Sequence, residues 1–190
     1  NLPGSMDRTY SKDDLLQEYS GNNTGDYRVP AIIIKTENGS RLTDFRYKSY
    51  KILPGKPKLA GLPASYVKSD KEAETLEVTL VDETIGAQLI LSYTIYNERP
   101  VITRNARLVN TSNQELRIEK IASMQLDLTK HDYDVISVPG QYALERQPER
   151  QELRRGITEF SSRRNSSSHH MNPFVALVDK NTDEFQGNAL

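Results

Sequence analysis

The stretch TLEVTLVDETIGAQLILSYTIY, residues 75–96, decides the fold class. Apolar and polar side chains alternate through residues 75–82 and again through residues 87–96, which is the period of a β-strand with one buried face. Residues 83–86 between them, ETIG, interrupt the alternation and end in Gly86, which favours a turn. We therefore predict two antiparallel strands joined by a turn over residues 83–86.

Similar patterns lie on both sides of this pair. Upstream, the β-branched residues 30–35, an Asn-Gly turn signature in residues 37–40 and the alternating residues 41–47 predict a hairpin. Downstream, strands are predicted over residues 101–108, 116–128, 132–138 and 173–178, and the last of these has the composition of a buried strand. Strands recur about every dozen residues with no convincing helix between them, which favours an antiparallel sandwich without an internal boundary.

Two segments break this pattern. Residues 54–63 contain three prolines and two glycines, so they predict a fixed loop and not a paired strand. Residues 1–28 are polar and rich in Gly and Asn, with a weak helical signal after Ser11. We expect an N-terminal arm over residues 1–28 and one β domain over residues 29–190.

Composition excludes several classes of function. The 190 residues carry 25 Lys and Arg against 26 Asp and Glu, so no broad positive field exists to bind nucleic acid or an anionic membrane. The absence of Cys excludes disulfides and thiolate catalysis and suits a reducing compartment. No apolar run approaches the roughly 18 residues of a membrane span, and no signal-peptide pattern is present. We expect a soluble, cytoplasmic protein.

Residues 141–156, QYALERQPERQELRRG, are rich in Arg and Glu. Pro148 interrupts any helix through them. One interpretation is a solvated face with weak surface ion pairs. The other is an Arg-rich surface that meets a partner domain or subunit.

The unusual segment SSRRNSSSHHMNPFVAL, residues 161–177, joins two Arg, a Ser run and two His to an apolar strand. Disorder is disfavoured because the strand at residues 173–178 follows at once, and a vector-derived tag is disfavoured by the position inside the chain. A metal site is also disfavoured. Adjacent His169 and His170 point to opposite faces of a strand, and no Cys is present to complete a zinc site.

Taken in order, short motifs along the chain resemble the N-terminal domain of bacterial α-galactosidases of glycoside hydrolase family thirty-six. The motifs are DRTYS at 7–11, LQEY at 16–19, GDYRVPA at 25–31, GKPKL at 55–59, GLPA at 61–64, AETLE at 73–77, VITR at 101–104, ER at 145–146, SRR at 162–164, SSH at 167–169 and NPF at 172–174. The chain departs from the family pattern at three positions, with Tyr142 in place of Trp and Asn165-Ser166 in place of Gly-Ala.

The resemblance implies an all-β antiparallel supersandwich of the galactose-mutarotase type, truncated at its C-terminal side. It implies a parent enzyme that hydrolyses α-galactosides such as melibiose and raffinose with retention of configuration and without a cofactor. Both catalytic aspartates would lie in a (β/α)8 barrel that these 190 residues do not include. We therefore expect no catalytic residue in this chain and no hydrolysis by the chain alone.

The resemblance also implies roles for individual residues. Arg8 of the Asp-Arg-Thr-Tyr-Ser motif would lie near the sugar in a neighbouring subunit of a tetramer, where a planar guanidinium suits sugar hydroxyls. The alternative is a solvated arm residue. Arg163, Arg164, His169 and Asn172 would form a structural latch that meets carboxylates of the barrel or of another subunit.

A second class of function stays open, namely a stand-alone carbohydrate-binding sandwich or a mutarotase-like epimerase. An epimerase needs acid and base groups in a groove, and His131, His169 and His170 are a small supply. A binding module would favour exposed aromatic platforms. The chain has no Trp, and most of its 10 Tyr alternate with apolar strand residues.

Overall fold

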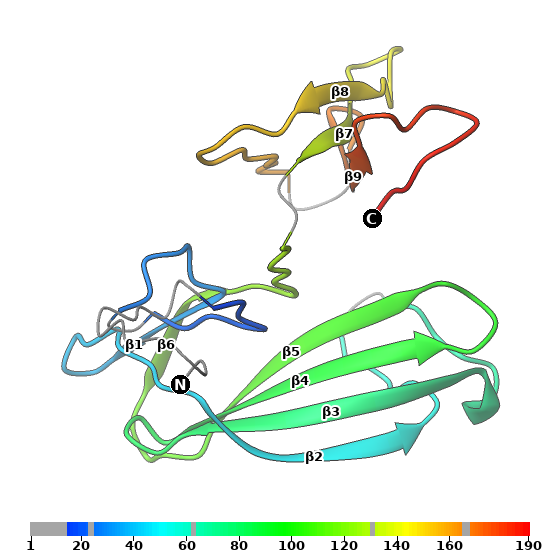
Figure 1. Cartoon of the computed structure of the whole chain (residues 1–190). Coiled ribbons are helices and arrows are strands. Elements are labelled where there is room, and N and C mark those ends of the chain that lie inside the picture. Colours follow the sequence, from blue (N-terminus) through cyan, green and yellow to red (C-terminus); the bar gives the residue numbers. More distant parts are fainter. Residues whose placement is uncertain (1–14, 23–24, 62–63, 130–131, 165–167) are drawn as a thin grey trace, which may run out of the picture. The chain divides into compact units, whose positions relative to one another are not determined.

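The computed structural model describes residues 15–22, 25–61, 64–129, 132–164 and 168–190. The chain forms two compact units, residues 1–127 and residues 128–190. Within the described ranges the regular structure is β-strand, apart from one 3-10 turn at Asp70–Glu72, and all named strands pair antiparallel (Figure 1). The predicted all-β antiparallel fold class is confirmed.

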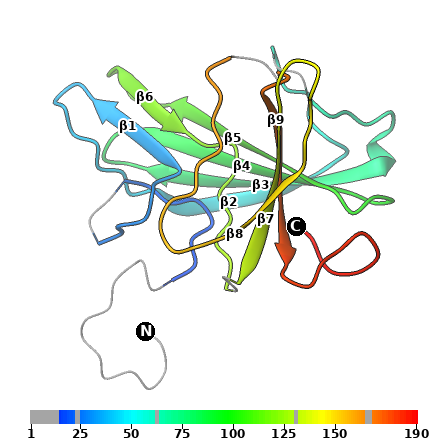
Figure 2. The same cartoon turned by 90° about the horizontal axis from the view of Figure 1, so that it is seen from above.

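The first unit contains two sheets. The larger has the order β2 (Arg46–Pro54), β3 (Ala73–Asp82), β4 (Ala87–Tyr96) and β5 (Ile102–Asn110), and the smaller pairs β1 (Ile32–Thr36) with β6 (Leu116–Ile121) (Figure 2). Ile32 and Ile34 of β1 pack against Leu89 and Leu91 of β4, and these four side chains are at most 4% exposed. The two sheets therefore face each other across a buried apolar core, as in a sandwich.

The predicted pair of central strands is confirmed. β3 and β4 pair along their whole length, from Asp82 opposite Ala87 to Ala73 opposite Tyr96. The buried Asp82 carboxylate accepts the backbone N–H groups of Thr84 and Ile85, at 3.0 and 3.3 Å, which closes the turn between the strands.

The predicted hairpin over residues 30–47 is wrong. Its turn exists, because Gly39 has a φ of 86° and the Thr36 N–H binds the Ser40 carbonyl at 3.0 Å. However, β1 pairs with β6, with Ile32 opposite Ile121, and β2 starts only at Arg46 and pairs with β3. Pairing with β6 lets β1 place both buried isoleucines on the β4 core, so packing between distant segments overrides the local turn.

The loop after β2 is fixed by a glycine. Gly55 is buried with a φ of 71°, its N–H binds the Ala73 carbonyl at 2.8 Å, and its carbonyl accepts the Thr75 hydroxyl at 2.8 Å. A Cβ at position 55 would lie 2.4 Å from Asp70 Oδ1. Only glycine therefore fits this conformation and this space.

The second unit is a three-stranded sheet in the order β8 (Glu149–Glu152), β7 (Tyr133–Pro139) and β9 (Met171–Asp179). The sequence showed neither the boundary near residue 127 nor β8, whose four side chains are all exposed. The expectation of a buried strand over residues 173–178 holds only for Val178, because Phe174 and Val175 are about half exposed. No helix in the described ranges has the length and apolar character needed to cross a membrane.

Candidate functional site

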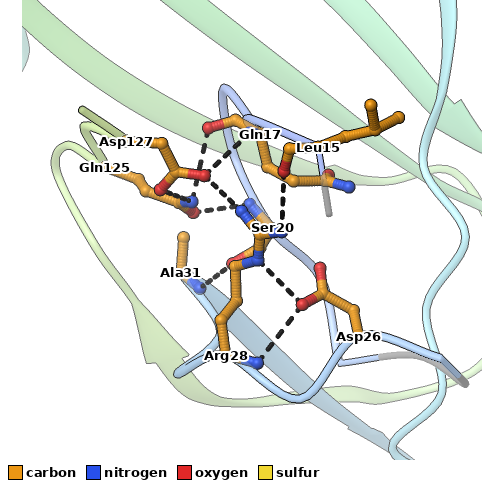
Figure 3. Close-up of polar contacts among 8 residues, drawn as sticks. All are labelled: Leu15, Gln17, Ser20, Asp26, Arg28, Ala31, Gln125 and Asp127. Carbon is orange, nitrogen blue, oxygen red and sulfur yellow. Dashed lines mark hydrogen bonds and ion pairs between the residues drawn. The ribbon is translucent and has the colours of Figure 1, made fainter. Parts of the chain in front are cut away.

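The end of the N-terminal arm is built into the first unit. Ser20 is fully buried, its N–H binds Gln125 Oε1 at 2.6 Å, and its carbonyl accepts the Ala31 N–H at 2.9 Å (Figure 3). Gly21 forms a parallel bridge with Ile32 of β1. We call residues 15–22 and 25–28, Gln125 and Asp127 the arm anchor.

Arg28 cross-links the arm anchor. Its Nε binds Asp26 Oδ1 at 2.8 Å, its Nη1 binds Asp127 Oδ2, and its Nη2 binds the Leu15 carbonyl at 2.8 Å (Figure 3). The Asp26 side chain is only 2% exposed, so its carboxylate depends on this partner. A planar guanidinium with several fixed donors can hold three chain segments at once, which a Lys ammonium does less well.

Asp127, the last residue of the first unit, also binds the arm. Its carboxylate accepts the Gln17 N–H at 2.8 Å and the Gln125 side-chain amide at 2.9 Å, in addition to Arg28. Partial burial alone would raise the pKa of Asp127, but the hydrogen bonds from Gln125 and Gln17 and the charge of Arg28 outweigh burial and lower it. The carboxylate form therefore holds the arm.

A second polar cluster ties the arm to the large sheet. Arg104 of β5 binds Glu18 through Nη2 and the Gln125 carbonyl through Nη1, the latter at 2.6 Å. Its guanidinium also lies 4.8 Å from the centre of the Tyr93 ring, and the Tyr93 hydroxyl donates to Glu18 at 2.8 Å. Burial, followed by the bond to Glu18, raises the pKa of Tyr93 to about 12. Residues 17–20 are thus fixed from both sides.

Sequence reasoning found only part of this arrangement. The motifs that carried the family resemblance contain Glu18, Asp26, Arg28 and Arg104, but nothing in their spacing indicated mutual contact. Asp127 lay inside a predicted strand and was not singled out. Arg8, the predicted substrate-binding residue, lies outside the described residues.

The four predicted latch residues lie in the second unit. Arg163 and Arg164 are exposed, His169 is half-buried in a turn, and Asn172 is half-buried on β9. In the part of the chain that the structure describes, neither arginine forms an ion pair with a carboxylate. The interface role of these residues stays a prediction.

The two histidine rings of this segment lie against each other at an interplanar angle of 40°. The His169 ring lies 4.1 Å from the His170 ring and meets the Tyr142 ring edge-on at 6.4 Å. Partial desolvation, followed by the charges of Arg164 and His169, lowers the pKa of His170, which favours a neutral imidazole. Across the described ranges, no group of three or more His, Asp and Glu is placed to hold a metal ion.

Gly140 fixes the position of the turn that contains the latch residue His169. Its N–H binds the His170 carbonyl at 3.1 Å, and a Cβ at position 140 would lie 2.7 Å from the His169 carbonyl oxygen and 2.8 Å from that of Leu144. Three backbone segments therefore meet at a point where no side chain fits.

Comparison with known proteins shows which family this chain matches and which proteins it is similar to. The family description "Glycosyl hydrolase family 36 N-terminal domain" matches residues 1–190. Alpha-galactosidase 1 of Pediococcus pentosaceus is 48% identical over 189 residues, and Alpha-galactosidase Mel36A of Lactobacillus acidophilus is 49% identical over 189 residues. Each alignment covers 100% of this chain and 26% of the relative.

Solved structures agree with the sequence comparison. The α-galactosidase AgaA of Geobacillus stearothermophilus matches with a TM-score of 0.93 and 49% identity, over 96% of this chain and 26% of that one. A variant of the same enzyme in complex with raffinose also matches, with a TM-score of 0.93, 48% identity and 100% of this chain covered. The chain thus spans about a quarter of the length of the relatives it matches. It belongs to the glycosyl hydrolase family 36 N-terminal domain family.

Proposed function

We propose that this chain is the N-terminal, non-catalytic part of a cytoplasmic, retaining α-galactosidase that hydrolyses terminal α-galactosides such as melibiose and raffinose. Family membership and the names of the relatives support this assignment. A retaining mechanism needs two carboxyl groups about 5–5.5 Å apart, one as nucleophile and one as acid/base. By the family resemblance, both are aspartates of a separate barrel.

The contribution of this chain is to position other parts of the enzyme. The observation that carries this proposal is the arm anchor, which fixes residues 15–22 and 25–28 through Arg28, Asp127 and the buried Ser20. A fixed anchor gives the preceding segment a defined origin. From there Arg8 reaches the active site of a neighbouring subunit in a tetramer and binds sugar hydroxyls through its guanidinium.

The latch residues serve assembly. Arg163 and Arg164 are exposed and present two guanidinium groups to solvent, while His169 and Asn172 belong to the turn and strand that follow. Exposed guanidinium groups are well suited to carboxylates on a barrel or on another subunit. Docking and oligomer assembly therefore depend on this segment.

The role of Arg8 is tested in the full-length enzyme. Arg8→Ala should lower kcat/KM for melibiose about 10- to 100-fold, the loss expected for a charge-assisted hydrogen bond to the substrate. Arg8→Lys should recover only part of the loss. Lys12→Ala, a charge removal in the same arm, serves as the control and should leave kcat/KM unchanged. Full activity of Arg8→Ala tetramers would contradict the proposal.

The role of the latch is tested separately. Arg164→Ala in the full-length enzyme should weaken tetramer formation, measured by sedimentation velocity, more than it changes turnover. Intact tetramers with a lowered kcat would argue against a latch. The 190-residue chain alone should not release galactose from melibiose, and measurable hydrolysis would overturn the assignment of catalysis to another domain.

A further inference from the structure

A groove lies on the face of the four-stranded sheet that points away from the core. Leu89 and Leu91 of β4 face the core. Because side chains alternate along a strand, the even-numbered positions of β4, including Ser92 and Thr94, face the other way. The loop that begins after Pro54 folds over this face and encloses a cavity of about 480 Å³. A cavity of this size is within the range of small-molecule sites.

The floor of the groove is polar and buried. Thr75, Glu77 and Thr94 are 0, 7 and 4% exposed. The hydroxyl groups of Thr75 and Thr94 lie 2.7 Å apart, and Thr75 also donates to the Gly55 carbonyl. A sheet face this deeply covered is normally apolar, because burying polar groups is unfavourable unless they find partners. The residue types on this floor therefore call for an explanation.

Glu77 is the only carboxylate among the residues that line the groove in the described ranges. Its Oε2 lies 2.8 Å from Lys51 Nζ, and its Oε1 accepts a long hydrogen bond of 3.4 Å from Ser92. Each carboxylate oxygen has two acceptor sites, so Glu77 retains capacity for further donors. Ligand hydroxyl groups could supply them.

Strand β5 adds polar side chains with open capacity. Thr103 and Asn105 line the groove and are half-buried, and Arg107 lies at its exposed edge. Across the described ranges, none of these three side chains makes a hydrogen bond or ion pair. Together they offer a hydroxyl, an amide and a guanidinium, which include both donors and acceptors.

The covering loop contributes both apolar and cationic side chains. Pro57, Leu59, Ala60 and Ala64 line the groove together with Lys56, Lys58 and Ser65. A ligand that matches both sides must have hydroxyl groups along one edge and C–H groups on one face. Sugars have this combination, and their hydroxyl groups can accept from Lys56, Lys58 and Arg107 as well as donate to Glu77. A phosphate group offers acceptors to these cations but has neither a C–H face nor the several hydroxyl donors of a sugar.

We propose that this groove binds a neutral saccharide of one or two rings, with Glu77, Thr103 and Asn105 accepting and donating hydrogen bonds to its hydroxyl groups. Leu59 and Pro57 cover the C–H face of the ring. The inference rests on the groove alone and does not depend on the catalytic role proposed for the parent enzyme.

The test is isothermal titration calorimetry of the full chain with galactose, melibiose, maltose and inorganic phosphate. At least one of the three sugars should bind saturably with a Kd in the millimolar range or tighter, and phosphate should not compete. Glu77→Gln should weaken binding about tenfold and Thr103→Val about fivefold, as expected for loss of a charge-assisted and a neutral hydrogen bond. NMR shifts should map to β5 and to the loop.

Thr79→Val is the matched control. Thr79 lies on the same face of β3 but does not line the groove, so this variant should keep the wild-type Kd. Thermal unfolding of each variant separates loss of binding from loss of fold. Absence of sugar binding to the folded chain, binding unaffected by Thr103→Val, or binding of phosphate in preference to sugar would each overturn the proposal.

Discussion

The two units of this chain form β-sheets equally well but bury their side chains very differently. In the first unit, two sheets face each other and enclose Ile32, Ile34, Leu89 and Leu91. In the second unit, a single sheet buries only Val135 and Val178 among the apolar side chains that the structure describes. Strand pairing satisfies the backbone in both, but only a second layer removes a large apolar area from water.

In the second unit, where a single sheet buries few apolar side chains, a polar clamp formed by Arg150 contributes to stability. Arg150 of β8 binds Asp134 at 2.7 Å and the carbonyl groups of Lys180 and Thr182 at 2.8 and 2.5 Å. These contacts join an exposed strand to the turn that follows β9. We therefore expect the first unit to depend on packing and the second on a few charged contacts.

The largest expected effect separates the two units directly. Leu89→Ala should lower the free energy of unfolding by about 3 kcal/mol, because it leaves a cavity in the layered core of the first unit. Urea denaturation gives the magnitude, and hydrogen exchange with mass spectrometry shows where protection is lost. Exchange should rise across β1, β4 and β5 but not across β7 and β9. An equal rise in both units would mean that they unfold as one.

The next variant tests whether the arm belongs to the first unit. Arg28→Ala should destabilise it by about 2 kcal/mol, because the buried Asp26 carboxylate loses its partner, and partial exposure of the cluster limits the loss. Exchange should increase most at residues 15–22. Arg28→Lys keeps the charge and should lose less. Unchanged protection at Ser20 in Arg28→Ala would show that the arm is held by other contacts.

A smaller effect is expected for the clamp of the second unit. Arg150→Ala should cost about 1 kcal/mol, because the side chain is partly exposed and its bonds are exchanged for bonds to water. Faster exchange at residues 179–182 is the readout. Arg154→Ala is the matched control, since the Arg154 side chain is 84% exposed and forms only one long ion pair with Glu152. Equal effects of the two variants would refute the clamp.

The smallest effect is a pH dependence of the arm anchor in the first unit. Because the pKa of Asp127 is lowered in the folded chain below its ordinary 3.8, the folded state binds its proton less readily than the unfolded state. Its stabilising contribution is complete above the ordinary pKa and is lost as the pH falls through the lowered value. Exchange at residues 15–22 should therefore increase below pH 4, and Asp127→Asn should remove this acid-dependent step.

The sequence predicted those elements that depend on local pattern. Alternation located β3 and β4, and the proline-rich segment after Pro54 is irregular as expected. The partner of β1 was not predictable from the turn at Gly39, because β6 lies some 80 residues away and the choice depends on burial against β4. Strand β8 was missed because its sequence, ERQE, contains no apolar residue to alternate.

The candidate site was predictable only in part, for a related reason. Family motifs marked the segments that contain Arg28, Arg104 and the latch residues. The arm anchor itself joins Arg28 to Asp127, 99 positions apart, by a polar contact that leaves no periodic trace in the sequence. Residues 122–127, expected to continue a strand, instead supply Gln125 and Asp127 as irregular chain beyond the end of β6.

Gly140 has a practical consequence for transplanting the latch into another scaffold. The pose of His169 and His170 is encoded more than twenty positions upstream, where three backbone segments crowd a position without a side chain. Grafting residues 161–172 alone would transfer the sequence without the contacts around Gly140 that fix the conformation of His169 and His170. A functional transplant has to carry the turn around Gly140 as well, and a library that diversifies the loop should keep that glycine constant.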